Sequence, residues 1–143
     1  MYARSLLTFL LLAFCALTSV MAAPQPHPST DILSVTSPKF NSVYKVGHKV
    51  PVKISIVNGT KSEFYKKNPK VELYLQKNIH LPLLNVHLGS VRARTLHKDG
   101  FEFKVKAKYL IKEQSNVPFR VRASFDLGAR SGFVDSPSFK LVK

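Results

Sequence analysis

The chain has 143 residues but only one cysteine, Cys15, and no tryptophan. A single thiol cannot form a disulfide within the chain, and it cannot supply the several cysteine ligands of a structural zinc site. A folded domain must therefore be held together by its apolar core and not by covalent cross-links. Without tryptophan, tyrosine and phenylalanine are the remaining rings for stacking on a ligand.

Long apolar runs are lacking except at the amino end of the chain. There, Arg4 precedes an apolar stretch at residues 6–17, and the small residues Ala22 and Ala23 follow. This pattern predicts a secretory signal peptide over residues 1–22, because the apolar stretch is too short to span a bilayer.

The remaining chain predicts one secreted domain. Residues 23–31 hold three prolines and predict an extended, Pro-rich leader without a fixed fold. Residues 32–143 have a suitable length for a single domain. No second apolar run and no GPI-anchor tail follow, so the product is expected to be secreted and released.

Acidic residues are scarce, at 8 Asp and Glu against 22 Lys and Arg, which gives a formal net charge of +14 at pH 7. Loss of residues 1–22 removes only Arg4 from this balance and leaves +13. Such an excess favours anionic polymers or membrane surfaces as partners. Nucleic acid is not expected as a partner, because a secreted chain does not normally meet it.

Enzyme signatures are missing from the sequence. There is no G-x-S-x-G elbow, no phosphate-binding glycine loop and no H-E-x-x-H helix. The spacing of His80, His87 and His97 fits no common metal site, so neither a metal nor a cofactor is expected. We therefore predict a protein that is not an enzyme. An unrecognised glycan-acting enzyme stays as an alternative, because glycosidase carboxylates can come from distant positions.

Alternation of apolar and polar residues recurs along the chain and predicts β-strands with one buried and one solvent-facing side. The expected strands cover residues 32–36, 49–57, 71–76, 91–96, 101–106, 116–126 and 138–142. The strand at 116–126 has the longest alternation and is expected at the centre of a sheet. Together the strands predict an all-β fold, an immunoglobulin-like antiparallel β-sandwich of about seven strands.

The segments between these strands carry turn and loop signals. Asp99-Gly100 predicts a hairpin turn at residues 98–100, and Pro82 predicts an irregular or edge segment at 81–88. The other connections are a long polar segment at 58–70, one possible helical turn at 107–114 and a turn at 128–132.

The order of several motifs resembles a known family. Pro38, Tyr44 and Gly47 precede the alternating strand at 49–57, and Phe139 lies in a closing strand after a serine-containing turn. This order resembles the fungal killer-toxin-resistance or KNH-like cell-wall synthesis domain, which is found at the amino end of Ser/Thr-rich GPI-anchored wall proteins. The resemblance implies an immunoglobulin-like sandwich, a cell-wall location and a link to β-glucan assembly. Two departures are Tyr44 and Ile56, which stand where that family commonly has tryptophan.

Basic residues in i, i+2 pairs are candidate anion contacts, because such pairs point to the same side of a strand. The pairs are Arg92 with Arg94, Lys104 with Lys106, and Arg120 with Arg122. A hairpin of the strands at 91–96 and 101–106 would join the first two pairs into one positive surface. The alternative is a solvated face that keeps the protein soluble.

Tyr65 and Tyr74 are candidate sugar contacts, because aromatic rings stack on the apolar faces of sugars. Tyr65 lies in the polar segment at 58–70, and Tyr74 points outward from its strand. The alternative for such rings is that they fold back and seal the edge of the domain. Asn58-Gly59-Thr60 fits the N-glycosylation pattern and predicts a glycoprotein.

These observations together predict a secreted, non-catalytic, cell-wall-associated protein that binds wall polysaccharide, with β-glucan as the expected partner. A cationic secreted factor that binds anionic membranes or host surfaces is the alternative from another class.

Overall fold

The computed structural model describes residues 27–77, 84–110 and 117–143, and the expected signal peptide lies outside these residues. Strands dominate the described residues, so the predicted all-β class is confirmed. The strands are β1 (His27–Pro28), β2 (Leu33–Ser37), β3 (Val43–Lys45), β4 (Lys49–Ile56), β5 (Lys70–Lys77), β6 (Leu84–Arg92), β7 (Phe101–Lys104), β8 (Phe119–Asp126), β9 (Ser131–Asp135) and β10 (Lys140–Val142). The short helices are η1 (Gly59–Lys61), α2 (Glu63–Lys67), α3 (Ala93–Asp99) and η2 (Ala107–Tyr109).

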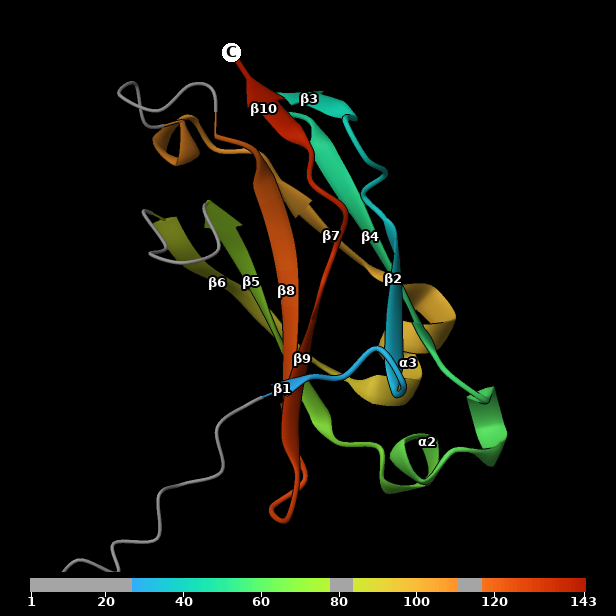
Figure 1. The fold of residues 1–143 in the computed structure, drawn as a ribbon. Helices are drawn as coiled ribbons and strands as arrows, with labels where there is room; N and C mark the ends of the chain where they lie inside the picture. Colours follow the sequence, from blue (N-terminus) through green and yellow to red (C-terminus); the bar gives the residue numbers. More distant parts are fainter. Residues whose placement is uncertain (1–26, 78–83, 111–116) are drawn as a thin grey trace, which may run out of the picture.

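The strands form three sheets arranged in two layers (Figure 1). One layer is a five-stranded sheet with the order β1-β9-β8-β5-β6. The other layer contains the three-stranded sheet β2-β4-β7, with the two-stranded sheet β10-β3 at the top of Figure 1. Neighbouring strands are antiparallel, except that β1 with β9 and β10 with β3 are parallel. β8, which matches the longest predicted strand, lies in the middle of its sheet.

One apolar core lies between the two layers, and the predicted alternation supplies it. In β4, Val50, Val52, Ile54 and Ile56 are buried whereas the residues between them are exposed. In β8, Phe119, Val121, Ala123 and Phe125 are buried. Successive side chains of a strand point to opposite faces, so each strand gives one set of residues to the core and one to the surface.

Aromatic packing closes the end of the fold near β3 and β10. Tyr44 on β3 is opposite Leu141 on β10, and its ring meets Phe139 edge to face with centroids 5.9 Å apart. Phe139 is fully buried. Gly47 has a φ of 87° and forms the turn from β3 into β4, a conformation that favours glycine. Pro38 is also buried, in the turn after β2.

The predicted strand at residues 91–96 is wrong. β6 ends at Arg92, and the chain then forms α3, in which Ala93 and Leu96 are buried. Their i, i+3 spacing places both on one side of the helix, which packs against β4. The predicted hairpin turn at 98–100 is wrong too, because Gly100 ends the helix with its N–H bonded to the Leu96 carbonyl at 3.0 Å.

Ordered structure begins before residue 32, within the expected Pro-rich leader. β1 pairs with β9, and the Ser29 N–H donates to the Phe133 carbonyl at 2.8 Å. Gly132 faces this attachment, and a Cβ on Gly132 would collide with the Ser29 side chain. The sheet therefore has β1 at its edge, where the missing N–H of Pro28 is tolerated.

Two predicted connections also contain regular structure. The end of the expected turn at 128–132 belongs to β9. The polar segment at 58–70 contains α2, because the Ser62 hydroxyl accepts a hydrogen bond from the Phe64 N–H at 3.1 Å and caps the helix. Phe64 is buried against Phe125, so this segment is fixed to the core.

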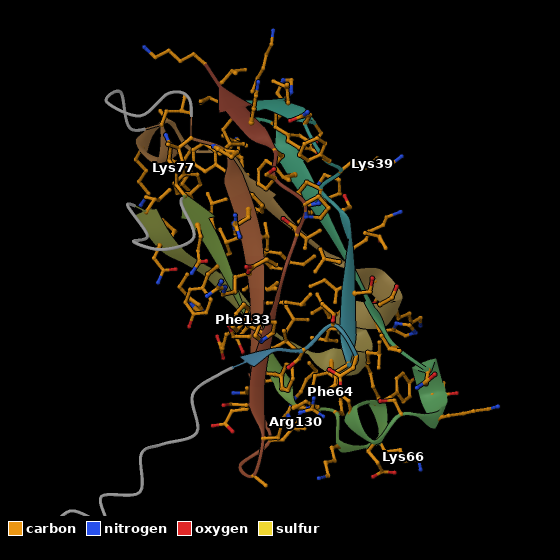
Figure 2. The ribbon with its side chains drawn as sticks, in the orientation of Figure 1. Lys39, Phe64, Lys66, Lys77, Arg130 and Phe133 are labelled. Carbon is orange, nitrogen blue, oxygen red and sulfur yellow. The ribbon has the colours of Figure 1, made fainter. Side chains whose placement is uncertain are left out.

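Lys77, at the end of β5, is a buried cation (Figure 2). Its side chain is only 2% exposed, and its ammonium lies 5.0 Å from the centroid of the Phe119 ring. It forms no ion pair with another described residue. Burial therefore lowers the pKa of the Lys77 ammonium from its ordinary value of 10.5.

We expect Lys77→Met to raise the free energy of unfolding by about 1 kcal/mol at pH 7, because a thioether fills the site without the cost of burying a charge. In the wild type, the unfolded chain binds the extra proton between the folded-state pKa and 10.5, so stability rises with pH over that interval. The variant is expected to lose this rise. Urea unfolding from neutral to alkaline pH measures both effects, with the exposed Lys67→Met as a control. Equal changes in the two variants would contradict the prediction.

Candidate functional site

The outer side of the five-stranded sheet is polar, and strand register arranges its side chains in rows. The central row contains His87, Tyr74, Arg122 and Asp135. One neighbouring row contains Asn85, Gln76 and Arg120, and the other contains Ser90, Glu72, Ser124 and Phe133. We refer to the side chains in these three rows as the polar face.

A hollow of about 510 Å³ lies over the polar face. It is lined by Lys70, Glu72, Tyr74, Gln76, Asn85, Arg122, Ser124, Phe125 and Asp126. Phe125 contributes its side chain mainly to the core, so Tyr74 is the half-buried ring that the sheet presents outward. The hollow thus combines one aromatic surface with hydrogen-bonding groups from three strands.

Glu72, Tyr74 and His87 contact one another within the polar face. His87 Nε2 lies 2.7 Å from Glu72 Oε2, and the rings of Tyr74 and His87 have centroids 5.2 Å apart. The hydrogen bonds from His87 and then from Ser90 lower the pKa of the Glu72 carboxyl. Glu72 is therefore a carboxylate at neutral pH and an acceptor for donors on a ligand.

Arg120 and Arg122 both bond to one carboxylate, that of Asp135. Arg122 donates from Nε and Nη2 to Asp135 at 2.7 and 2.8 Å, and Arg120 donates from Nη1 at 3.2 Å. The Arg122 guanidinium also lies 3.9 Å from the centroid of the Phe133 ring. The two arginines point to the same side as predicted, but Asp135 neutralises part of their charge and fixes Arg122 in place.

The predicted positive surface of four basic residues does not form. Arg92 is the last residue of β6 in the five-stranded sheet and Arg94 follows in α3, whereas β7, with Lys104, belongs to the three-stranded sheet. Lys106 follows β7 and is exposed, and Lys104 is opposite Lys49 on the outer side of that sheet. The prediction failed because it paired two segments that are neighbours in sequence but belong to different layers.

Arg94 is a structural residue of the helical connection. Its guanidinium donates to the carbonyls of Tyr65 and Lys66, both at 2.9 Å, and so satisfies the carboxyl end of α2. Arg92 donates to the Asn68 carbonyl at 3.2 Å in the same region. Both arginines hold the connection against the sheet, and they do not lie on one strand face.

Tyr65 lies away from the hollow. Its ring is half-buried between the Arg94 guanidinium, at 5.2 Å, and the His97 ring, at 6.0 Å. This packing matches the alternative reading, in which the ring folds back against the domain. Asn58 is exposed, with a φ of 63°, in the turn after β4, so its side chain is open to modification.

Most of the other residues of the polar face were not predicted as site residues from the sequence. Glu72 and Gln76 resemble ordinary solvated positions of a strand, and Asn85, His87 and Phe133 lie outside the predicted strands. The available signal was the outward set Glu72, Tyr74 and Gln76, which mixes an aromatic ring with hydrogen-bonding groups. Only the pairing of β5 with β6 and β8 shows which other residues join them.

Two histidines of the described residues, His87 and His97, have local partners on different elements. His97 Nδ1 accepts a hydrogen bond from the Ile56 N–H at 3.1 Å, and His87 bonds to Glu72. His80 lies outside the described residues. Within residues 27–77, 84–110 and 117–143, no three metal-ligating side chains come together.

The comparisons with known proteins add no relative: no family model matches, and no curated protein or solved structure is detectably similar. In the part of the chain that the structure describes, no helix is both long and apolar enough to cross a membrane.

Proposed function

We propose that the protein is a secreted, non-catalytic, cell-wall-associated β-sandwich of immunoglobulin-like type that binds wall polysaccharide, with β-glucan as its ligand. The observation that carries this proposal is the hollow over the polar face, in which Tyr74 stands among fixed hydrogen-bonding groups. The signal-peptide pattern and the family resemblance support the location and the polymer.

The chemistry of the hollow suits a sugar chain. The Tyr74 ring offers an apolar surface for the C–H side of a pyranose, and its neighbours offer donors and acceptors for hydroxyl groups. Gln76 Nε2 donates to Asn85 Oδ1 at 3.2 Å, and Asp135 orients Arg122. Because these groups lie on strands and hold one another, little ordering is needed when a ligand binds.

The same groups favour binding over hydrolysis. A glycosidase needs one carboxylic acid with a raised pKa as proton donor. The hydrogen bonds to Glu72 lower its pKa instead, and the Asp126 carboxylate accepts a bond from the Gly128 N–H at 2.7 Å in the next turn. Glu72, which lines the hollow, is therefore not prepared as a general acid.

Tyr74→Ala is expected to reduce retention on β-glucan about five- to tenfold, because the ring contact is removed from an otherwise intact face. The measurement is sedimentation of the chain from residue 23 with insoluble β-1,3-glucan, β-1,6-glucan or chitin, at low salt and in about 0.5 M sodium chloride. Tyr74→Phe keeps the ring and should retain binding within about twofold. Tyr65→Ala is the matched tyrosine control away from the hollow.

Retention on β-1,3-glucan or β-1,6-glucan that survives salt and falls only in Tyr74→Ala would support the proposal, whereas salt-resistant retention on chitin alone would overturn β-glucan as the ligand. Retention on all three polymers that disappears in salt, equally for both alanine variants, would mean that charge alone binds them and would overturn it. Absence of retention at low salt would overturn it as well.

A further inference from the structure

Two large apolar side chains are strongly exposed in the described residues, and they are close in the sequence. Phe40, in the turn before β3, is 69% exposed, and Val43, the first residue of β3, is 55% exposed. Single exposed apolar residues are common on protein surfaces, but these two share their surroundings with a group of lysines.

Strand register places two lysines, Lys45 and Lys140, beside Val43, and Lys39 lies next to Phe40 in the sequence. Val43 is opposite Lys140 in the parallel pair of β3 and β10, so the two side chains project to the same side. Lys45 lies two positions after Val43 and shares that side. Lys39 precedes Phe40 and extends into solvent in Figure 2. We call Lys39, Phe40, Val43, Lys45 and Lys140 the apical patch.

Among the described residues, no acidic side chain pairs with the lysines of the apical patch. No Asp or Glu occurs in residues 32–62 or 136–143, which contain the patch. By contrast, Lys49 pairs with Glu102 and Lys66 pairs with Glu63.

We propose that the apical patch docks the protein on an anionic lipid bilayer. Lysines near such a surface are attracted to the headgroups, and exposed apolar side chains gain from burial at the boundary of the acyl chains. A soluble polyanion satisfies the lysines equally well but gives Phe40 and Val43 nowhere to bury. The combination of free lysines and exposed apolar side chains therefore favours a bilayer as the partner.

The apical patch is separate from the polar face. It lies on the β10-β3 sheet, whereas the polar face belongs to the five-stranded sheet. A membrane contact through β3 and β10 therefore leaves the hollow accessible. The two proposals stand or fall separately, because polymer retention and vesicle binding are read with different partners and different variants.

The test is co-sedimentation of the chain from residue 23 with phosphatidylcholine vesicles, with and without about 30% phosphatidylserine, at about 0.1 M salt. One variant replaces Lys39, Lys45 and Lys140 by Gln. Its control replaces Lys61, Lys67 and Lys98 by Gln. The control variant has the same net charge, but the lysines are removed from the end of the molecule that contains α2 and α3 (Figure 1). A third variant, Phe40→Ser with Val43→Ser, keeps every charge.

The wild type should bind the phosphatidylserine vesicles and bind pure phosphatidylcholine at least tenfold less. Each lysine is expected to contribute about fivefold, so the apical triple variant should lose about a hundredfold and the control triple no more than about threefold. The Phe40/Val43 variant should lose about tenfold on vesicles but keep its binding to heparin, a polyanion without acyl chains.

Three results would overturn the proposal. The first is absence of binding to the anionic vesicles. The second is an equal loss in the two triple variants, which would assign binding to net charge. The third is full vesicle binding by the Phe40/Val43 variant, which would mean that charge alone holds the protein on the vesicle and that Phe40 and Val43 do not enter the bilayer. Thermal unfolding of each variant ensures that folded proteins are compared.

Discussion

Phe139→Ala is expected to lower the free energy of unfolding by about 3 to 5 kcal/mol, the usual loss when a fully buried phenylalanine is truncated. Phe139 is 0% exposed, and its ring contacts Tyr44 edge to face and lies 6.3 Å from the Phe119 ring. Its backbone also exchanges two hydrogen bonds with Phe119, at 2.8 and 2.9 Å. Truncation therefore opens a cavity at the point where β8 meets the β3 and β10 end.

Urea unfolding monitored by circular dichroism measures this loss. Phe40→Ala is the matched control, because the same side chain is removed from a position that is 69% exposed. Its free energy of unfolding should change by no more than about 0.5 kcal/mol. A small effect at Phe139, comparable to that at Phe40, would show that the ring does not support the core.

Gly100→Ala is the second substitution with a large expected effect, a loss of about 2 to 4 kcal/mol. Gly100 has φ 73° and ψ −159°, a region that is almost restricted to glycine. A Cβ there would lie 2.8 Å from the Val52 carbonyl oxygen, which belongs to the backbone of β4 and cannot rotate away. The end of α3 or the pairing of β4 with β7 must therefore shift.

Gly128→Ala is the control that measures the cost of a left-handed backbone conformation without a steric collision of the added Cβ. Gly128 has a φ of 82°, but nothing lies within 4 Å of a Cβ at that position. The expected loss is about 1 kcal/mol, which is the conformational part alone. If the two glycine variants unfold at the same urea concentration, the contact of a Cβ at Gly100 with the Val52 carbonyl costs no measurable stability.

The sequence predicted the strands that obey simple alternation. Residues 49–57 and 116–126 became β4 and β8 because one side of each strand faces a shared core. The prediction of a strand at 91–96 failed because Val91, Ala93 and Thr95 alternate with other residues in the same way as in a strand. The competing helical signal was Ala93 with Leu96 at i, i+3, followed by Gly100, and burial of both residues against β4 decides in its favour.

The candidate site was predicted less completely than the strands. The outward orientation of Tyr74, Arg120 and Arg122 follows from periodicity within one strand. Which strands are neighbours is set by long-range packing, and this separates Arg92 from Lys104. The Arg122 contacts with Asp135 and Phe133 depend on β9, which was not predicted because residues 131–132 resemble a turn.

β4 runs between two ends of the molecule, one next to Asn58 and the other next to β3 and β10. Its eight residues rise about 3.3 Å each and span roughly 25 Å. Asn58 follows one end of β4, whereas the turn at Gly47 joins the other end to Val43 and Lys45. A hydrophilic sugar chain on Asn58 would disfavour contact of lipid with the α2 and α3 end. Such a modification would then select the orientation of the molecule at a bilayer, with β3 and β10 toward the lipid and Asn58 toward the solution.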